Sequence, residues 1–212
     1  MYIRIGIVDD HNVMRDGVKN IIEFNSDYSV IFQASNGKEC LDYLEENHCI
    51  VDILLLDICM PKLDGFKVLE TIKKRYYHIR TIFLTSYEDN KHFFNALDSG
   101  VDGYLLKNIG YDELLYAISE VSKGLAYIDK RMNLSFKEYV SDIEIPKEKL
   151  TKREKEIITY VAAGKLNKEI AFELEIREET VKNHLTRIFH KLNVSDRTQA
   201  AICAFKNHFI DI

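Results

Sequence analysis

The sequence predicts an α/β fold, a doubly wound five-stranded parallel sheet, followed by a small all-α domain of four helices. Two observations carry this prediction. Five short apolar runs alternate with helical patterns in residues 1–122, and such alternation is typical of parallel strands joined by right-handed crossovers. From Leu150 onward, apolar residues recur only at helical spacing, so the remainder of the chain is expected to form a separate helical domain.

The elements of the predicted sheet domain are short. Residues 53–56 are aliphatic throughout, which indicates a strand buried on both faces. Pro61 breaks regular structure after this strand, and Gly100 stops a later helix. The strands are predicted at 3–8, 30–34, 53–57, 81–86 and 103–107, and the helices at about 13–22, 37–44, 66–75, 90–97 and 111–121.

Polar side chains close four of the five predicted strands. Asp9 and Asp10 follow the first strand, and Asp57 ends the third. Thr85 and Lys107 mark the ends of the fourth and the fifth. An aspartate at a strand end often only caps the next helix. However, the carboxyl ends of parallel strands meet at one edge, where ligands bind in open α/β sheets, so this convergence favours a binding site.

Three carboxylates at one edge repel one another unless a cation binds between them. Oxygen ligands of this kind suit Mg²⁺, which retains several waters and takes one or two carboxylates plus a phosphate. A carboxylate nucleophile beside Mg²⁺, with an ammonium and a hydroxyl near the phosphoryl oxygens, provides the groups needed to form an aspartyl phosphate. The residues therefore predict phosphoryl chemistry at Asp57, with Mg²⁺ as the cofactor.

Composition places the chain among soluble globular proteins, with 46% hydrophobic and 30% charged residues. No apolar run reaches the roughly 18 residues of a membrane span, and the first residues open into a strand pattern instead of a signal peptide. The four cysteines form no CxxC pair and no zinc motif, which fits a reducing compartment. We therefore expect a cytoplasmic protein without a membrane partner.

Charge is unevenly distributed along the chain. Residues 1–146 carry a net charge of −8, whereas residues 147–212 carry +3. This asymmetry suggests two modules with different partners. The basic surplus by itself is a weak indication of nucleic-acid binding.

The strand-end residues belong to longer motifs. These are Asp9-Asp10, Asp57 with Met60-Pro61 and Asp64-Gly65, Thr85-Ser86, and Gly103-Tyr104-Leu105-Leu106-Lys107. Over residues 1–122 the motifs resemble the receiver domain of a two-component response regulator, which has a flavodoxin-like fold. The resemblance implies that a sensor histidine kinase phosphorylates Asp57.

The resemblance also implies roles for single residues. Mg²⁺ would be held by Asp9, Asp10, Asp57 and the backbone carbonyl of Cys59. The phosphoryl group would be contacted by Thr85 and Lys107, and Tyr104 would swing inward on activation. Without the resemblance, Tyr104 is an ordinary sheet-edge aromatic residue. One position departs from the pattern, because many receivers have a cis proline after the lysine and this chain has Asn108. We therefore expect either a trans bond or strain at Lys107–Asn108.

Residues 123–149 are predicted to be a partly helical linker, because they lack a buried-strand pattern. A short helix is possible within 134–140, and 145–149 form a charged connector.

Four helices are expected in residues 150–212. Thr151 and Glu154 form a capping box at the start of the first helix, and Gly164 ends it. Asn167 is expected to cap the second helix. The remaining elements are predicted at 175–177 (a tight corner), 178–192 (the third helix) and 196–209 (the fourth helix).

The third of these helices has two different faces. Its apolar face is spaced to line a core and consists of Val181, Leu185, Ile188, Phe189 and Leu192. Its opposite face carries Lys182, Asn183, Thr186, Arg187 and His190. Two short helices around a tight corner, the second with such a polar face, predict a helix-turn-helix that enters the major groove of DNA. A four-helix bundle with a solvated polar face has nearly the same pattern and stays open at this point.

Specific strings favour the helix-turn-helix. They are Leu150-Thr151-x-Arg153-Glu154-x-Glu156-Ile157, Asn167-Lys168-Glu169-Ile170-Ala171, Thr180-Val181-Lys182-x-His184-Leu185, and Lys191-Leu192-x-Val194-x-x-Arg197-Thr198-Gln199-Ala200. These strings closely resemble the LuxR-type DNA-binding domain. Its pairing with a receiver resembles the NarL/FixJ subfamily of response regulators.

This second resemblance implies contacts with double-stranded promoter DNA, on inverted-repeat or tandem half-sites. Base edges would be contacted by Lys182, Asn183 and Thr186, and DNA phosphates would be contacted by Asn167, Lys168, Arg187 and Thr151. In a homodimer, a second copy of the chain would be contacted by Ala200, Ala201 and Ala204. The family usually has a small residue at the corner and Ser or Thr before the reader helix, whereas this chain has Glu175 and Arg177. Glu178 and Glu179 would repel DNA phosphates, so we expect modest affinity that depends on dimerisation.

The sequence as a whole predicts a DNA-binding transcription regulator that is switched by phosphorylation of Asp57. It is not expected to be an enzyme beyond slow auto-phosphorylation or dephosphorylation. Phosphorylation would release the helix-turn-helix domain, drive receiver dimerisation, or both. A phosphohydrolase would need an acid two residues after the nucleophile, where Cys59 stands. A regulator that works without phosphorylation would lack Asp10, Asp57 or Lys107, and all three are present.

Overall fold

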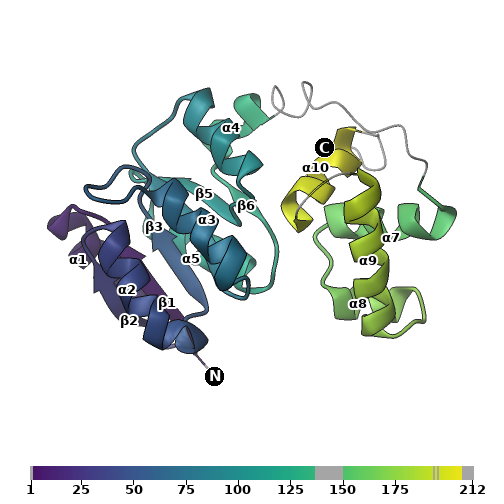
Figure 1. Cartoon of the computed structure of the whole chain (residues 1–212), viewed down its shortest axis with the longest axis horizontal. Coiled ribbons are helices and arrows are strands. Elements are labelled where there is room, and N and C mark those ends of the chain that lie inside the picture. The colour runs from purple at the N-terminus through teal and green to yellow at the C-terminus, as the bar shows by residue number, and fades with distance from the viewer. Residues whose placement is uncertain (1, 137–149, 193, 195, 207–212) are drawn as a thin grey trace. The chain divides into compact units, whose positions relative to one another are not determined.

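The computed structural model describes residues 2–136, 150–192, 194 and 196–206. The chain divides into two compact units, Met1–Asp129 (unit 1) and Lys130–Ile212 (unit 2), and each unit is described by itself (Figure 1). Within the described residues, no helix combines the length and the apolar character needed to cross a membrane.

Unit 1 is a doubly wound parallel sheet with helices on both faces. Its strands are β1 (Ile3–Val8), β2 (Tyr28–Ala34), β3 (Ile53–Leu56), β4 (Arg80–Thr85), β5 (Gly103–Leu106) and β6 (Tyr127–Ile128). Its α-helices are α1 (Asn12–Glu23), α2 (Gly37–Asn47), α3 (Gly65–Arg75), α4 (Asn90–Asp98) and α5 (Tyr111–Ser122). The strand order is β2-β1-β3-β4-β5-β6. Helices α2 and α3 lie in front of the sheet in Figure 1, and α1 and α5 pack on its other face.

The position of each strand follows from its burial. β3 is buried along its whole length and lies between β1 and β4. Because side chains alternate across a strand, Leu55 faces the core formed with α1 and α5, together with Ile5 and Leu84 of the neighbouring strands. A packed core of this kind makes the sheet a rigid support. The carboxyl ends of β1, β3, β4 and β5 therefore meet at one fixed edge.

The predicted number of strands was wrong by one. β6 lies in the predicted linker and pairs in parallel with β5, with Gly103 opposite Tyr127 and Tyr104 opposite Ile128. It has two residues, both half-buried. A strand this short shows no alternation in the sequence, because its position depends on the neighbouring strand and not on a local pattern. The ten elements predicted for unit 1, five strands and five helices, are confirmed to within a few residues at each end.

Unit 2 is helical throughout its described part. A 3₁₀ turn at Lys130–Met132 leads into helical residues at 133–136, and the remainder of the short helix predicted at 134–140 lies outside the described residues. The following helices are α7 (Lys152–Ala162), α8 (Asn167–Glu173), α9 (Glu178–Leu192) and α10 (Arg197–Lys206). α9 matches its prediction, and α10 is described as far as Lys206 of the predicted 196–209.

The helix starts show one confirmed prediction and one wrong one. The capping box is confirmed, because the Thr151 hydroxyl accepts from the Glu154 N–H and the Glu154 carboxylate accepts from the Thr151 N–H. Asn167 does not cap α8. It is the first helical residue, and Leu166 occupies the cap position, where its N–H donates to Glu169 Oε2 at 2.7 Å. Because Glu169 accepts the backbone N–H of Leu166, the cap residue needs no polar side chain, and leucine is tolerated there.

Candidate functional site

Asp57 is held rigidly at the end of β3. Its N–H donates to the Val8 carbonyl at 2.8 Å, which continues the β1–β3 pairing by one residue. Its Oδ1 accepts the Ile58 N–H at 2.8 Å. The loop then packs tightly, because a Cβ at Gly65 would lie 2.3 Å from the Asp57 carbonyl oxygen. Only glycine fits at that position, so the Asp64-Gly65 pair of the sequence motif has a steric reason.

Lys107 joins two buried carboxylates. Its Nζ lies 2.8 Å from Asp57 Oδ2 and 2.8 Å from Asp9 Oδ2. The side chains are 13%, 5% and 4% exposed respectively, so these charges interact with little screening by water. The N–H of Lys107 donates to the Thr85 carbonyl at 2.7 Å, which fixes this end of β5 against β4.

The pKa shifts show opposing effects of burial and charge. Burial raises the pKa of Asp57 above its ordinary value, and the nearby Lys107 ammonium offsets this only in part. For Lys107, burial acts to lower the pKa, but its hydrogen bonds and charge interactions with Asp57 and Asp9 outweigh burial, and the pKa is raised. The site therefore holds a cation firmly between carboxylates while leaving Asp57 poorly stabilised as an anion.

Asp9 and Asp10 lie beside Asp57, as predicted. Together with His11, these residues offer ligand atoms that all lie within 4.8 Å of one another. The His11 Nδ1 is 2.9 Å from Asp10 Oδ1 and 3.1 Å from Asp9 Oδ1, and both His11 and Asp10 are exposed. Sequence reasoning missed His11, although it directly follows the two aspartates. The three carboxylates are the hard oxygen donors that Mg²⁺ prefers, and their crowding favours a bound cation.

Thr85 and Tyr104 are both fully buried. The Tyr104 hydroxyl donates to the Tyr87 carbonyl at 2.8 Å, and its ring packs edge-on against Phe93 at 5.1 Å between centroids. Burial raises the pKa of Tyr104. The ring is therefore fully buried in this structure, and its swing on activation stays a prediction. The Lys107–Asn108 bond is trans, as one of the two expected alternatives, since the described residues contain no cis peptide bond.

Tyr87 is a residue of the site that sequence reasoning missed. Its N–H donates to Thr85 Oγ1 at 3.2 Å, and its carbonyl accepts from Tyr104. Its hydroxyl interacts with the exposed Cys59 side chain, and this hydrogen bond is the main cause of its raised pKa. Tyr87 therefore links the loops after β3 and β4 with the buried Tyr104. Its position two residues after Thr85 is the only sequence signal, and spacing alone does not reveal it.

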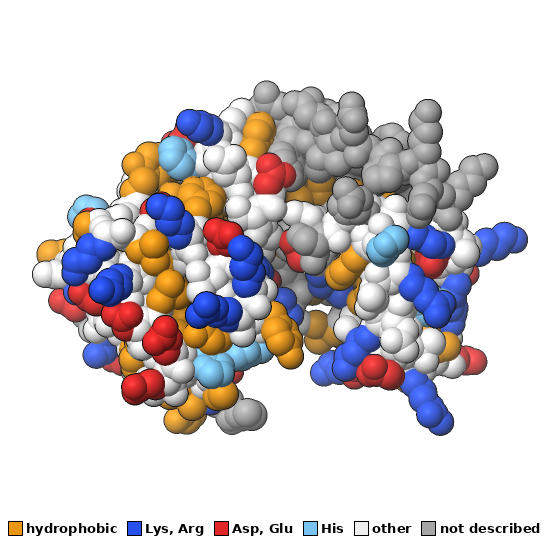
Figure 2. All heavy atoms as spheres, viewed as in Figure 1, with side chains coloured by type: hydrophobic (Ala, Val, Ile, Leu, Met, Phe, Trp, Pro, Cys, Tyr) orange, Lys and Arg blue, Asp and Glu red, His pale blue; other side chains and the backbone are white. Residues whose placement is uncertain are grey.

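The polar face of α9 is exposed, as predicted. Lys182, Asn183, Thr186 and Arg187 are all exposed, while the apolar stripe of α9 is buried in the core of unit 2. Figure 2 shows Lys and Arg side chains spread over the visible surface of unit 2, with acidic side chains among them. The acidic residues at the start of α9 are close to the reader face, because Lys182 Nζ lies 3.6 Å from Glu178 Oε1 and 3.8 Å from Glu179 Oε2.

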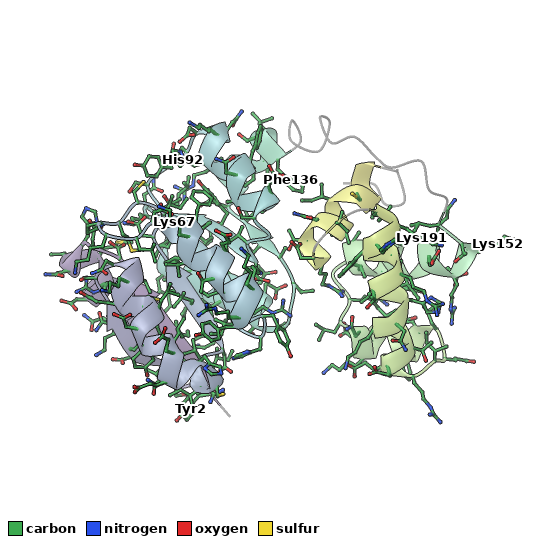
Figure 3. The ribbon with its side chains drawn as sticks, viewed as in Figure 1. Tyr2, Lys67, His92, Phe136, Lys152 and Lys191 are labelled. Carbon is green, nitrogen blue, oxygen red and sulfur yellow. The ribbon has the colours of Figure 1, made fainter. Side chains whose placement is uncertain are left out.

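α9 is fixed to the rest of unit 2 by an ion pair that the sequence did not predict. Lys191, labelled on α9 in Figure 3, has its Nζ 2.8 Å from Glu154 Oε2. The same oxygen accepts the Thr151 N–H at 2.7 Å. Glu154 is buried, yet its pKa is lowered, because the hydrogen bonds from Lys191 and Thr151 outweigh the effect of burial.

The loop before α8 is held in a similar way. The Arg197 guanidinium donates to the carbonyl of Lys165 and, at 3.1 Å, to Asn167 Oδ1. Asn167 is therefore half-buried and oriented by Arg197, whereas Lys168 beside it is exposed. Arg153 donates to the Leu174 carbonyl at 2.7 Å and so binds the carboxyl end of α8. These contacts fix the helix-turn-helix as a single body.

Two of the three predicted dimer residues lie inside their own domain. Ala200 and Ala204 are fully buried in the core cluster of unit 2, and Ala201 is half-buried against it. With α10 in this position, Ala200 and Ala204 cannot contact a second copy of the chain. The small-residue face of α10 is explained by close packing within the domain, and small residues alone do not distinguish this role from an intermolecular one.

Comparison with known proteins matches both units to described families. Residues 5–119 match the response regulator receiver domain, and residues 148–204 match the bacterial regulatory proteins of the luxR family. The chain belongs to the two-component response regulators. The transcriptional regulatory protein LiaR of Bacillus subtilis is 37% identical over 212 residues, which cover 99% of this chain and 100% of LiaR.

Solved structures agree with this assignment. The response regulator ChrA of a heme-sensing two-component system is 30% identical, with 99% of each chain covered and a TM-score of 0.55. A structure of two RcsB dimers bound to two parallel DNAs has a TM-score of 0.60, with 98% of each chain covered. Its identity of 20% shows a shared fold alone. This response regulator thus combines a receiver domain with a LuxR-type DNA-binding domain, and the second domain makes it a regulator of transcription.

Proposed function

We propose that a sensor histidine kinase phosphorylates Asp57 in an Mg²⁺-dependent reaction, and that the phosphoryl group controls binding of the LuxR-type domain to promoter DNA. The observation that carries this proposal is the Lys107 ammonium, which lies 2.8 Å from carboxylate oxygens of both Asp57 and Asp9 at the strand edge. We assign residues 1–122 to the receiver, 123–149 to the linker and 150–212 to the DNA-binding domain.

Mg²⁺ would be held by Asp9, Asp10, Asp57 and the backbone carbonyl of Cys59. The fit rests on the donor set, because hard carboxylate oxygens within 4.8 Å of one another suit this cation. When bound, Mg²⁺ neutralises charge on the carboxylates and on the transferred phosphoryl group. His11 lies next to Asp9 and Asp10 and orients them by hydrogen bonds.

The residues of the chain would share the work of phosphoryl transfer. Asp57 is the nucleophile, and its carboxylate forms a bond to phosphorus as the bond between phosphorus and the kinase histidine breaks. Lys107 is placed to pair with a phosphoryl oxygen, since its ammonium already contacts Asp57. Thr85 would supply a hydroxyl from the neighbouring strand end. The ionised form of Asp57 is the reactive one, and its poor stabilisation in the fold makes it a better nucleophile.

On the DNA side, base edges would meet Lys182, Asn183 and Thr186, and phosphates would meet Asn167, Lys168, Arg187 and Thr151. Exposure of Lys182, Asn183, Thr186 and Arg187 on one face of α9 supports this assignment. The operator would be promoter DNA with inverted-repeat or tandem half-sites, bound by a homodimer to which Ala201 is the remaining candidate contact. The solved structure of RcsB dimers on DNA offers a precedent for such an assembly. Phosphorylation would act by release of the DNA-binding domain, by receiver dimerisation, or by both. The protein would work in the cytoplasm.

Incubation with phosphoramidate and Mg²⁺, followed by intact-mass measurement, tests the proposal. We expect wild type to gain one phosphoryl group only when Mg²⁺ is present, D57N to gain none, and the control D16N to behave as wild type. Asp16 is an exposed residue of α1, so D16N changes charge without touching the site. Selection of DNA sequences by phosphorylated and unphosphorylated wild type then shows whether the modification changes binding. A folded wild type that gains no mass, and that beryllofluoride leaves unchanged in DNA affinity, would refute the proposal.

A further inference from the structure

Asp129 is a buried carboxylate that the proposed mechanism does not use. It is 1% exposed, directly follows β6 and is the last residue of unit 1. Its Oδ2 accepts the Leu106 N–H at 3.2 Å, and its own N–H donates to the Tyr104 carbonyl at 2.8 Å. The residue therefore holds β5 at two points, on both sides of Leu105.

These two contacts complete the outer edge of β5. On its other side β5 pairs with β4, where the Lys107 N–H donates to the Thr85 carbonyl at 2.7 Å. On the β6 side the strand pairing ends at Ile128, opposite Tyr104, so β6 offers no backbone carbonyl opposite the amide of Leu106. The Asp129 carboxylate takes the place of that carbonyl. At 3.2 Å this hydrogen bond is at the long end of the usual range, but both residues are 1% exposed, so water does not compete for the amide.

The geometry points to Asp129 as a positioning residue for phosphoryl transfer at Asp57. Leu106, whose amide Asp129 binds, is bonded directly to Lys107, and Lys107 carries the ammonium that bridges Asp57 and Asp9. Without the Asp129 carboxylate, the Leu106 amide loses its acceptor on the β6 side, although the backbone contact with Tyr104 remains. The residue next to Lys107 is then held from the β4 side alone, and the Lys107 ammonium is positioned less firmly. This inference rests on the proposed function, because it concerns the rate of that same reaction.

The position of Asp129 adds a consequence for signalling. Since Asp129 ends unit 1, the chain that leads to the DNA-binding unit starts at a residue that contacts both Tyr104 and the neighbour of Lys107. A shift of β5 on phosphorylation would therefore displace Asp129 and, with it, the start of that connection.

Asp102 provides a matched control. It is also a buried aspartate, 8% exposed, and it also accepts a backbone amide, from Thr81 at 2.9 Å. Its other partners are Lys73 and Arg80. Asp102 lies before β5, at the opposite edge of the sheet from Asp57. Loss of either aspartate removes a buried hydrogen bond, but only Asp129 acts on the strand end that carries Lys107.

The experiment compares full-length wild type, D129A, D129N and D102N. The initial rate of phosphorylation by phosphoramidate is measured over a series of Mg²⁺ concentrations, at a temperature where thermal unfolding shows every variant to be folded. We expect D129A to react about tenfold more slowly at saturating Mg²⁺, which is the usual scale for loss of a residue that orients a site. The Mg²⁺ concentration for half-maximal rate should stay unchanged, because Asp129 acts through Lys107 and is not a metal ligand.

The remaining variants separate positioning from general stability. D129N retains an acceptor oxygen and should recover most of the rate, while D102N should lower the melting temperature and leave the rate at the wild-type value. Equal rates for D129A and wild type, or the same loss of rate in D129A and D102N, would overturn the inference while leaving Asp57 as the phosphoacceptor. A folded wild type that gains no phosphoryl group would overturn the proposed function and this inference together.

Discussion

Replacement of Lys107 with methionine tests how the acidic site is held together. In the wild type, the Lys107 ammonium separates Asp57 and Asp9, whose side chains are 5% and 4% exposed. Methionine has a similar length and no charge, so K107M leaves two buried carboxylates facing each other. Removing one partner from a buried ion pair costs about 3–5 kcal/mol. Asp10 beside the site is exposed, so water reaches its edge and partly solvates the carboxylates. The expected loss in the free energy of unfolding is therefore at the lower end of this range, about 3 kcal/mol.

A loss of this size is readily measured. For a unit of roughly 130 residues it corresponds to a fall in Tm of about 10 °C, which calorimetry of the full chain at pH 7 without Mg²⁺ would resolve. Two results should accompany it: Mg²⁺ should restore most of the lost stability, because it replaces the missing cation, and the double variant K107M/D9N should be more stable than K107M. Lys73 pairs with Asp102 at 2.9 Å but is 28% exposed, and Asp102 keeps Arg80, so K73M is a control with a smaller expected loss. A Tm for K107M equal to that of wild type would refute the reasoning.

Three further predictions concern other residues. The raised pKa of Asp57 means that its ionisation costs more in the folded than in the unfolded chain, so stability falls as pH rises above the ordinary value of 3.8. D57N should therefore raise Tm near pH 7 without Mg²⁺, with the difference vanishing below about pH 4; a Tm difference that stays constant with pH would contradict this. The pKa of Glu154 is lowered, so ionisation of Glu154 stabilises the folded chain, and K191M should destabilise unit 2 by about 1–2 kcal/mol near pH 7. This difference should disappear as pH falls through the folded pKa of Glu154, which lies below its ordinary value of 4.5. In DNA-binding assays across salt concentrations, R187A should weaken binding to all sequences and reduce the salt slope by about one, whereas N183A should relax the preference at one base pair by about 1–3 kcal/mol; identical effects of both variants would contradict the division of roles.

The sequence was sufficient to predict the elements of the sheet and the convergence of its polar strand ends. Hydrophobic runs such as 53–56 are determined by burial on both faces, and strands that end at one edge bring Asp9, Asp57 and Lys107 together regardless of loop details. The same holds for α9, whose buried and exposed faces follow from helical periodicity.

The wrong predictions and the missed residues both occur where a contact between distant segments determines the structure. β6 forms because β5 offers an unpaired edge, and its two residues contain no signal of their own. Ala200 and Ala204 fit closely into the core of their own domain, and their small size is compatible with either kind of contact. Tyr87 joins the site through its backbone, and any residue type can provide backbone hydrogen bonds. Asp129 acts through a pairing that only the strand order reveals.

The two units contain the same chemical pair with opposite consequences. In each, a lysine Nζ lies 2.8 Å from an oxygen of a buried carboxylate, Lys107 with Asp57 and Lys191 with Glu154. The same Glu154 oxygen also accepts the Thr151 amide, no second carboxylate competes for Lys191 among the described residues, and the pKa is lowered. For Asp57, burial outweighs the hydrogen bond and the charge of Lys107, the nearby Asp9 carboxylate adds to the effect of burial, and the pKa is raised. A second carboxylate on the same lysine thus leaves excess negative charge at the strand edge, which supports the proposed binding of Mg²⁺ there.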